Sequence, residues 1–206
     1  IREQGEIIEP IDFGKPRFPY ESGSREYQKQ AFENWKNNKQ KGLFAMATGT
    51  GKTITSLNCL LEIYKRTGYY KAIILVPTIT LVNQWESECR KFNFNTILKV
   101  SGSNSEWREE LGSIKASEQL DTTGKSVSYV IICTYASFAK PAVFDRLNSL
   151  SRNRLLLIAD EAHNMGSRQL MKKLGDITYY RRIGLSATPE RQYDATGNNA
   201  INTFFN

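Results

Sequence analysis

A glycine-rich run between an apolar segment and an amphipathic one offers phosphate-binding chemistry. Residues 46–53 read MATGTGKT. The two glycines allow backbone N–H groups to turn inward around an anion, and the start of the following helix adds its positive end. Lys52 can reach the outer phosphates of a nucleotide, and the Thr53 hydroxyl can bind Mg²⁺. The strict pattern begins with glycine, whereas this run begins with Met46. The expected nucleotide-binding residues in this loop are Thr48, Gly49, Thr50, Gly51, Lys52 and Thr53.

Two adjacent carboxylates follow the apolar run at 155–159. Residues 160–163 are Asp-Glu-Ala-His. Open α/β sheets bind ligands at the carboxyl ends of their strands. Asp160 is therefore expected to hold Mg²⁺, and Glu161 to orient and deprotonate the water that attacks the γ-phosphate. An isolated Asp-Glu pair also serves as favourable charge at a helix N-terminus, but a phosphate loop in the same chain favours catalysis, with Glu161 and Lys52 as the catalytic residues.

A second polar turn follows the apolar segment at 183–186. Residues 186–189 are Ser-Ala-Thr-Pro. Ser186 and Thr188 can exchange hydrogen bonds with the turn at 160–163 if the two strands are neighbours. Taken alone, the tetrapeptide is also a common generic turn, so its meaning depends on the other motifs.

Positioning these motifs requires short apolar strands that alternate with helices. Strands are expected at 42–47, 71–76, 96–101, 129–134, 155–160 and 183–186. Helices are expected at 24–39, 51–66, 79–91, 105–119, 136–149 and 167–173. Uniformly apolar strands separated by helices indicate a parallel sheet covered on both faces. The expected fold is α/β, with a surface loop at 120–128, an N-terminal arm or linker at 1–23 and one domain at 24–206.

Composition limits the function classes. The chain has 206 residues with 28 Lys and Arg against 21 Asp and Glu, a net charge of +7. Such a balance is typical of nucleic-acid binding, although many basic domains gain only solubility from it. A single histidine excludes a multi-histidine metal site, and three cysteines without CxxC spacing argue against a disulfide framework or a zinc site. No apolar run approaches the ~20 residues that cross a bilayer. We expect an intracellular protein without a membrane partner.

Together, the motifs TGTGKT, DEAH and SATP resemble the first RecA-like motor domain of superfamily 2 helicases and translocases. Residues 25–28 (REYQ) are similar to the Q motif, although Ser24 stands where that motif has leucine. Residues 76–78 with Leu81, Val82, Gln84 and Trp85, and residues 134–138 (TYASF), are similar to two strand-end motifs that line the nucleic-acid track in that family. The sequence around GLSATPER is most similar to the XPB-like and restriction-enzyme branch. The resemblance covers residues 24–191.

This resemblance implies a P-loop NTPase that uses ATP and Mg²⁺. It assigns adenine recognition to Arg25 and Gln28, and coupling between ATP and nucleic acid to His163, Ser186 and Thr188. It assigns nucleic-acid contacts to Pro77, Thr78, Thr134 and Tyr135. For Leu81, Val82 and Trp85, a core position is the expected one.

The implied function is that of an ATP-binding domain in an ATP-dependent helicase or translocase, acting on DNA rather than RNA. In this family the arginine fingers belong to a second RecA-like domain, so residues 1–206 alone are expected to be nearly inactive. The alternative is a nucleotide-gated module that binds nucleic acid or a protein partner without turnover. A P-loop small-molecule kinase would need a substrate lid and gives no reason for DEAH together with SATP.

Overall fold

Parallel strands form the centre of the molecule, and three of them lead directly into the polar motifs. The computed structural model describes residues 14–47, 49–102, 106–150, 154–187 and 195–206. Within these residues six strands pair in the order β1-β6-β5-β2-β4-β3, and all neighbours are parallel. The strands are β1 (Lys41–Ala45), β2 (Lys71–Val76), β3 (Ile97–Val100), β4 (Tyr129–Thr134), β5 (Leu156–Asp160) and β6 (Arg181–Ser186). The predicted α/β fold with a parallel central sheet is confirmed.

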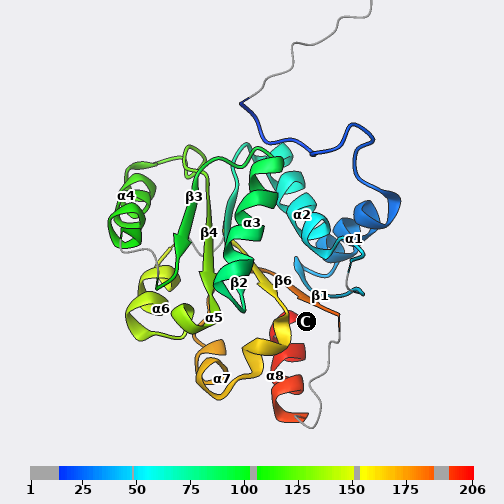
Figure 1. Cartoon of the computed structure of the whole chain (residues 1–206). Coiled ribbons are helices and arrows are strands. Elements are labelled where there is room, and N and C mark those ends of the chain that lie inside the picture. Colours follow the sequence, from blue (N-terminus) through cyan, green and yellow to red (C-terminus); the bar gives the residue numbers. More distant parts are fainter. Residues whose placement is uncertain (1–13, 48, 103–105, 151–153, 188–194) are drawn as a thin grey trace, which may run out of the picture.

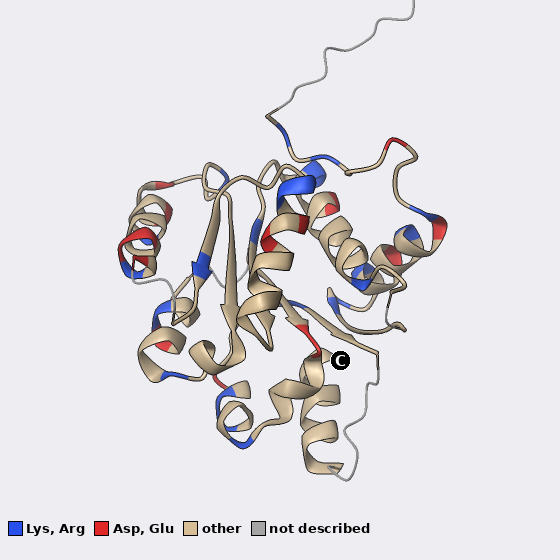
Figure 2. Cartoon of the chain, in the orientation of Figure 1, with Lys and Arg blue, Asp and Glu red and all other residues tan. Residues whose placement is uncertain are grey.

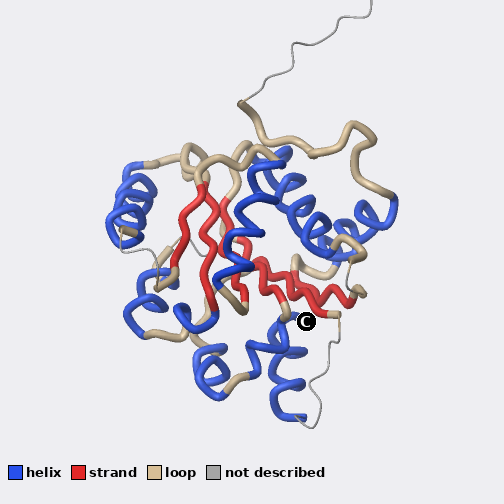
Figure 3. The backbone as a smooth tube through the Cα atoms, viewed as in Figure 1, coloured by secondary structure: helices blue, strands red, loops and turns tan. Residues whose placement is uncertain are grey.

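Helices cover both faces of the sheet (Figure 1). They are α1 (Glu26–Asn37), α2 (Lys52–Thr67), α3 (Ile79–Lys91), α4 (Trp107–Leu120), α5 (Tyr135–Phe138), α6 (Pro141–Asn148), α7 (Arg168–Leu174) and α8 (Ala195–Phe205), with a 3-10 helix η1 (Ala162–Gly166). Figure 3 shows the strands as a central layer with helices around it. Among the described residues, no helix has the length and apolar character needed to span a membrane.

The strands at the centre of the sheet are apolar throughout because both of their faces are buried. In β2, Ala72 and Ile74 belong to the core that contains α1, α2 and α3. Ile73 and Leu75 belong to the other core, which contains α4 to α8. Successive side chains of a strand point to opposite faces. The alternation therefore places α1 to α3 on one face and α4 to α8 on the other.

The helix predicted at 136–149 is wrong as a single element, because the structure divides it into α5 and α6. Proline restricts the residue before it to extended backbone, and Lys140 has φ −70° and ψ 129°. Pro141 then occupies the first turn of α6, where a missing N–H leaves no hydrogen bond unmade. The remaining predicted strands and helices are confirmed with boundary shifts of a few residues.

Helix α8 is the one long element that the sequence pattern does not predict. Its sequence, ATGNNAINTFF, contains Thr, Gly and Asn residues of low helix propensity. Burial of Ile201, Phe204 and Phe205 in the core on the α4 to α8 side stabilises it instead. A Cβ atom at Gly184 would lie 3.0 Å from the Phe205 ring and 3.1 Å from the Cβ of Ala162. Glycine at this position of β6 lets α8 and η1 approach the strand.

The described part of the N-terminal arm lies against the end of α3. The backbone N–H of Arg17 donates to the carbonyl oxygen of Phe92 at 2.9 Å. The Phe18 ring packs edge-on against the Phe92 ring, with 5.4 Å between centroids. Residues 14–23 therefore contact the body of the domain, while the division at residue 23 stays a prediction.

Arg182 fastens α8 to the sheet. Its guanidinium donates to the carbonyl oxygens of Tyr179, Phe204 and Ile177 at 2.8, 3.0 and 3.1 Å, and it lies 4.0 Å from the centroid of the Phe204 ring.

We predict that Arg182→Gln lowers the free energy of unfolding by about 2–3 kcal/mol, because three half-buried carbonyl groups lose a charged donor. Urea unfolding measures this. The exposed Arg168→Gln is the control and should change stability by less than about 0.5 kcal/mol. Equal effects of the two variants would contradict the role of Arg182.

Glu86 ties α3 to the edge strand β3. Its carboxylate lies 2.7 Å from Lys99 Nζ and 2.8 Å from Arg90 Nη2. The hydrogen bond from Lys99, with help from Arg90, lowers the pKa of Glu86. A lowered native pKa means that the stabilisation is present above the ordinary glutamate pKa and is lost as the pH falls through the native value.

We predict that Glu86→Gln lowers the free energy of unfolding by about 0.5–1 kcal/mol at neutral pH. The difference from wild type should close in acid, where both side chains are uncharged, and shrink in 1 M salt. Urea unfolding across pH, with the exposed Glu21→Gln as control, checks both trends. A difference that persists unchanged in acid would show that the ion pairs are not its cause.

Candidate functional site

The loop after β1 has the backbone shape of an anion cradle. Gly49 and Gly51 have φ of 81° and 88°, a left-handed conformation that glycine adopts without strain. Helix α2 begins at Lys52, directly after Gly51. Its unpaired N–H groups and its positive end favour a bound phosphate. The Thr50 hydroxyl donates to the carbonyl oxygen of Ala47 at 2.6 Å and closes the loop. Thr48 lies outside the described residues.

Helix α1 braces this loop from one side. The Tyr27 hydroxyl donates to the carbonyl oxygen of Thr50 at 3.0 Å. A Cβ atom at position 51 would lie 3.1 Å from that hydroxyl. Gly51 is therefore required twice, by its positive φ and by the close approach of Tyr27. The contact joins the segment expected to recognise adenine to the segment expected to bind phosphate.

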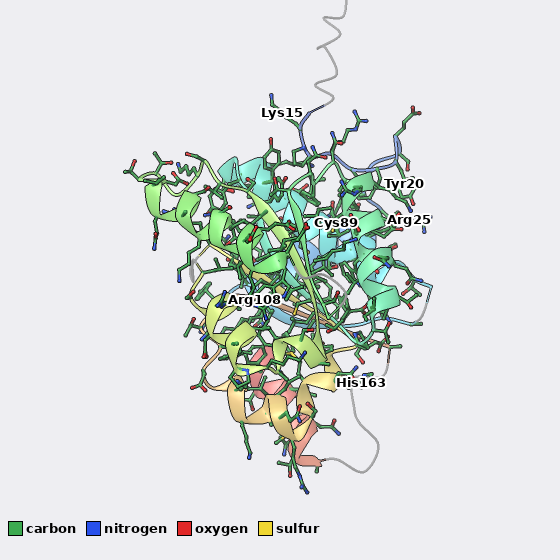
Figure 4. The ribbon with its side chains drawn as sticks, turned by 60° about the vertical axis from the view of Figure 1, so that its left-hand side comes forward. Lys15, Tyr20, Arg25, Cys89, Arg108 and His163 are labelled. Carbon is green, nitrogen blue, oxygen red and sulfur yellow. The ribbon has the colours of Figure 1, made fainter. Side chains whose placement is uncertain are left out.

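The start of α1 forms the wall of a cavity of about 350 Å³ beside the loop. Gln28 is only 3% exposed, and its side-chain oxygen accepts the backbone N–H of Arg25 at 2.8 Å. An amide oxygen has two lone pairs and the amide nitrogen two protons, so Gln28 retains a donor and an acceptor for a base. Figure 4 shows Tyr20 and Arg25 on the same side of the molecule. The cavity is lined by Phe18, Tyr20, Ser22, Gly23, Arg25, Tyr27, Gln28, Gly49, Thr50, Gly51 and Ile54.

Phe18 and Tyr20 are functional candidates that the sequence analysis assigned only to an arm. The Tyr20 side chain is 51% exposed, and it borders this cavity and the neighbouring one. The exposed Tyr20 ring suits stacking on a planar base, and the half-buried Phe18 ring packs beside it with 6.1 Å between the ring centroids. The available signal was two aromatic residues shortly before Arg25, in a stretch otherwise rich in Pro and Gly.

A second cavity of about 520 Å³ lies on the other side of the loop. It brings together the expected phosphate, metal and catalytic residues from β1–α2 and from the end of β5. Its lining comprises Tyr20, Gly49, Gly51, Lys52, Thr53, Ile54, Leu81, Gln84, Trp85, Ser87, Glu88, Asp160 and Glu161. The acidic segment that ends β5 is visible as a red strand end in Figure 2. The two cavities share the glycine loop, so together they can hold the base and the phosphates of one nucleotide.

Asp160 is held by donors on both carboxylate oxygens. Its Oδ2 accepts the indole N–H of Trp85 at 2.9 Å, and its Oδ1 accepts the backbone N–H of Glu161 at 3.0 Å. Asp160 is 8% exposed, and burial raises the pKa of its carboxyl group, while the Trp85 hydrogen bond opposes that rise. The Tyr135 hydroxyl donates to the Asp160 carbonyl oxygen at 3.0 Å, which fixes the backbone as well.

Glu161 follows in a strained backbone conformation. Its φ of 48° and ψ of 60° are left-handed, which is uncommon for a residue with a side chain. The carbonyl oxygen of Glu161 accepts the backbone and side-chain N–H groups of Asn164, each at 2.9 Å, and these bonds hold the turn. The carboxylate then lies 3.7 Å from Lys52 Nζ. The two predicted catalytic residues thus face each other across the cavity.

Two of the expected coupling residues lie at the ends of neighbouring strands, His163 in η1 after β5 and Ser186 at the end of β6. Strands β5 and β6 are paired, and Asp160 is in register with Leu185. His163 Nδ1 lies 3.6 Å from Glu161 Oε2 and, among the described residues, is a buried atom without a hydrogen-bond partner. Ser186 is fully buried. Thr188 lies outside the described residues, so the coupling role of these residues stays a prediction.

The expected nucleic-acid residues divide into two surface and two internal positions. Pro77 is half-buried and Thr78 is exposed, and the Thr78 hydroxyl accepts the N–H of Leu81 at 3.3 Å as the N-cap of α3. Thr134 and Tyr135 are buried at 5% and 7% exposure. Their side chains bond within the protein, Thr134 to Ser137 and Tyr135 to Asp160. The nucleic-acid role of Thr134 and Tyr135 stays a prediction, and their burial leaves little of either residue accessible to a strand.

The donors at this edge fit Mg²⁺ and no metal that requires a full set of protein ligands. Among the described residues, no three His, Cys, Asp or Glu side chains cluster as metal ligands. Mg²⁺ is ordinarily held by one or two carboxylates together with waters and substrate phosphates. The buried Asp160 carboxylate and the Thr53 hydroxyl line the same cavity, and they are suited to this kind of site.

A sequence model of the family described as "Type III restriction enzyme, res subunit" matches residues 21–191. The DNA 3'-5' translocase XPB2 of Sulfurisphaera tokodaii is 31% identical over 194 residues, which are 93% of this chain and 36% of that protein. Protein CHROMATIN REMODELING 25 of Arabidopsis thaliana is 30% identical over 151 residues, 68% of this chain and 15% of that protein. The chain thus spans about a third or less of the length of these relatives.

Solved structures share the fold. The Type ISP restriction-modification enzyme LlaGI, in complex with a DNA substrate mimic, superimposes with a TM-score of 0.64 at 24% identity over 82% of this chain and 18% of its own. The SWI2/SNF2 ATPase core of Sulfolobus solfataricus, in complex with double-stranded DNA, gives 0.64 at 18% identity over 93% of this chain and 38% of its own. The chain belongs to the restriction-enzyme res-subunit family and has the fold of the first RecA-like domain of superfamily 2 helicases and translocases.

Proposed function

We propose that this chain is the ATP-binding half of an ATP-dependent motor that moves along, or opens, DNA. One observation carries the proposal: Lys52, Asp160 and Glu161 line a single cavity beside the glycine loop, with Lys52 Nζ 3.7 Å from the Glu161 carboxylate. Phosphoryl transfer needs charge stabilisation and a positioned water rather than covalent chemistry from the protein. These three side chains supply a cation, a metal-binding carboxylate and a base.

Each group has a distinct task in that reaction. The cradle N–H groups and Lys52 bind the β- and γ-phosphates, and Thr53 and Asp160 would hold Mg²⁺. When bound, Mg²⁺ neutralises charge that develops on the phosphate oxygens. Glu161 orients the attacking water and accepts its proton. In the structure its carboxylate is paired with Lys52, so a γ-phosphate that attracts Lys52 also frees Glu161 for water.

DNA is the proposed track because two solved structures with the same fold contain DNA or a DNA mimic. The LlaGI and SWI2/SNF2 structures were both solved with DNA or a DNA mimic. In this chain Thr78, at the exposed start of α3, and Pro77 beside it offer backbone and hydroxyl groups to a phosphate. A second RecA-like domain is the proposed partner, since an arginine supplied across the cleft would stabilise the transferring phosphoryl group. Residues 14–23 would act as part of the adenine pocket rather than as a passive linker.

A nucleotide-gated binding module is the competing function. Such a module would need the same cavities for the nucleobase and the phosphates, but no general base to deprotonate water. The position of Glu161, aimed at the loop by a strained turn, favours turnover. Phosphate release by the wild-type protein, and its loss in Glu161→Gln, decides between the two functions.

Gln28 provides the test of base choice. We predict that Gln28→Ala weakens ATP binding roughly tenfold and narrows the preference for ATP over GTP. On the edge that carries N7, adenine offers an acceptor and the N6 donor, whereas guanine offers two acceptors, N7 and O6. Calorimetric titration with each nucleotide in Mg²⁺ measures both affinities. Gln30→Ala is the matched control, since Gln30 is exposed on the same helix and its side-chain amide donates to Asn34 Oδ1. An unchanged ATP/GTP ratio in Gln28→Ala would remove the adenine assignment.

Lys52 and Glu161 separate binding from chemistry. Lys52→Ala is expected to weaken ATP binding at least tenfold, because it removes a charge-assisted contact to phosphate. The control is Lys65→Ala on the same helix, where Lys65 pairs with Glu62 at the surface.

Glu161→Gln is expected to bind ATP as well as wild type does, within about twofold. In the protein that also carries the second motor domain, its phosphate release should fall roughly 10²–10⁴-fold. Turnover at the wild-type rate in Glu161→Gln would move the role of general base to another residue, whereas absence of phosphate release from the wild-type protein would support the binding module.

A further inference from the structure

Trp85 connects the metal-binding carboxylate to helix α3. Its side chain is 2% exposed, and it belongs to the apolar core with Val82 and Cys89, as the sequence analysis expects for a core residue. Its indole N–H nevertheless points out of that core and donates to Asp160 Oδ2 at 2.9 Å. A buried indole N–H needs an acceptor, and a carbonyl oxygen would satisfy it. Here the acceptor is the carboxylate at the mouth of the phosphate cavity.

Hydrogen bonds from two donors hold the Asp160 carboxylate in one orientation. A carboxylate turns easily about its last side-chain bond, whose energy profile is broad and two-fold. The backbone N–H of Glu161 holds Oδ1 and the indole of Trp85 holds Oδ2, at 3.0 and 2.9 Å. Each oxygen has two lone pairs, so each keeps one for a further partner. Without the indole N–H, only the contact to the adjacent residue would remain, and the plane of the carboxylate would be free to rotate.

Helix α3 is fixed at both of its ends, so it can hold Trp85 accurately. Thr78 caps its start, about 10 Å along the axis from Trp85. Past its last turn, Phe92 receives the backbone N–H of Arg17 and packs against Phe18 of the arm. Between them, Glu86 binds Lys99 of β3. A side chain on such an element is positioned by the whole helix rather than by its own rotamer alone.

We propose that Trp85 is a positioning residue for Mg²⁺, its indole N–H holding the Asp160 carboxylate in the orientation that admits the ion. The proposal rests on the Mg²⁺ role of Asp160 in the proposed function. Partners that orient metal ligands typically change metal affinity 10–100-fold when they are removed. The loss should appear mainly in the Mg²⁺-dependent part of nucleotide binding, because the group that the substitution removes donates to Asp160, the expected Mg²⁺ ligand.

The chain contains its own matched control. Trp35 is also 2% exposed, lies in the same core, and donates its indole N–H at 2.9 Å, but to the backbone carbonyl oxygen of Arg182. Trp85→Phe and Trp35→Phe therefore remove the same group from the same kind of environment. Only Trp85→Phe removes an indole N–H that donates to a carboxylate. Comparable decreases in the thermal midpoint are expected for the two variants.

The experiment is calorimetric titration of ATP in EDTA and in saturating Mg²⁺. Wild type and Trp35→Phe should show the same ratio of the two dissociation constants. Trp85→Phe should bind ATP in EDTA with the wild-type dissociation constant. The factor by which Mg²⁺ increases its ATP affinity, called the Mg²⁺ gain, should be roughly 10–100-fold smaller than in wild type. An unchanged gain would overturn the role of Trp85 while leaving the proposed function intact. Absence of Mg²⁺-dependent ATP binding in wild type would overturn the proposed function, and this inference with it.

A second measurement uses the unaltered protein and stands even if Trp85→Phe does not fold. The chain has three tryptophans, Trp35, Trp85 and Trp107, whose indole N–H resonances can be assigned by nuclear magnetic resonance with Trp35→Phe and Trp107→Phe. Addition of Mg²⁺ to the ATP-bound protein should shift the Trp85 resonance and leave that of Trp35 in place. A Trp85 resonance that does not respond to Mg²⁺ would contradict the proposal.

Discussion

A sheet that is parallel throughout and buried on both faces imposes one constraint from which the site follows. All of its strands end at the same edge, and the chain must return over a helix before it can begin the next strand. Polar residues that continue the chain from these strands are therefore gathered at one edge of the sheet. Lys52, Asp160 and Ser186 all follow or end such strands, on β1, β5 and β6. The apolar interiors of the same strands supply the rigidity that a reaction dependent on positioning requires.

Much of this arrangement is readable from the sequence because its signals are local. An apolar run such as 71–76, followed by a polar turn and an amphipathic stretch, specifies strand, turn and helix without reference to the rest of the chain. The glycines of the phosphate loop are equally local, since a positive φ is a property of single residues. For this reason the order of strands, helices and motifs along the chain follows from the sequence. The residues at the centre of the candidate site follow from it as well.

The features that escape prediction depend on partners distant in the sequence. Helix α8 has weak propensity and exists because Phe204 and Phe205 enter a core made by other segments. Tyr20 gains its meaning from a cavity whose other wall is the loop at residue 51. Trp85 reads as a core residue, and it is one. Only the folded structure shows that its single polar atom meets a carboxylate 75 positions further along the chain.

The backbone at Glu161 carries a consequence for anyone who engineers this domain. A left-handed conformation at a residue with a side chain costs of order 1–2 kcal/mol, which a glycine would not incur. Selection for thermal tolerance alone would thus favour replacing the residue whose carboxylate lies 3.7 Å from Lys52. Under the role proposed for Glu161, stability and turnover are opposed at this position. A library built for robustness should therefore leave position 161 unvaried and draw its gains from the surface of the helices.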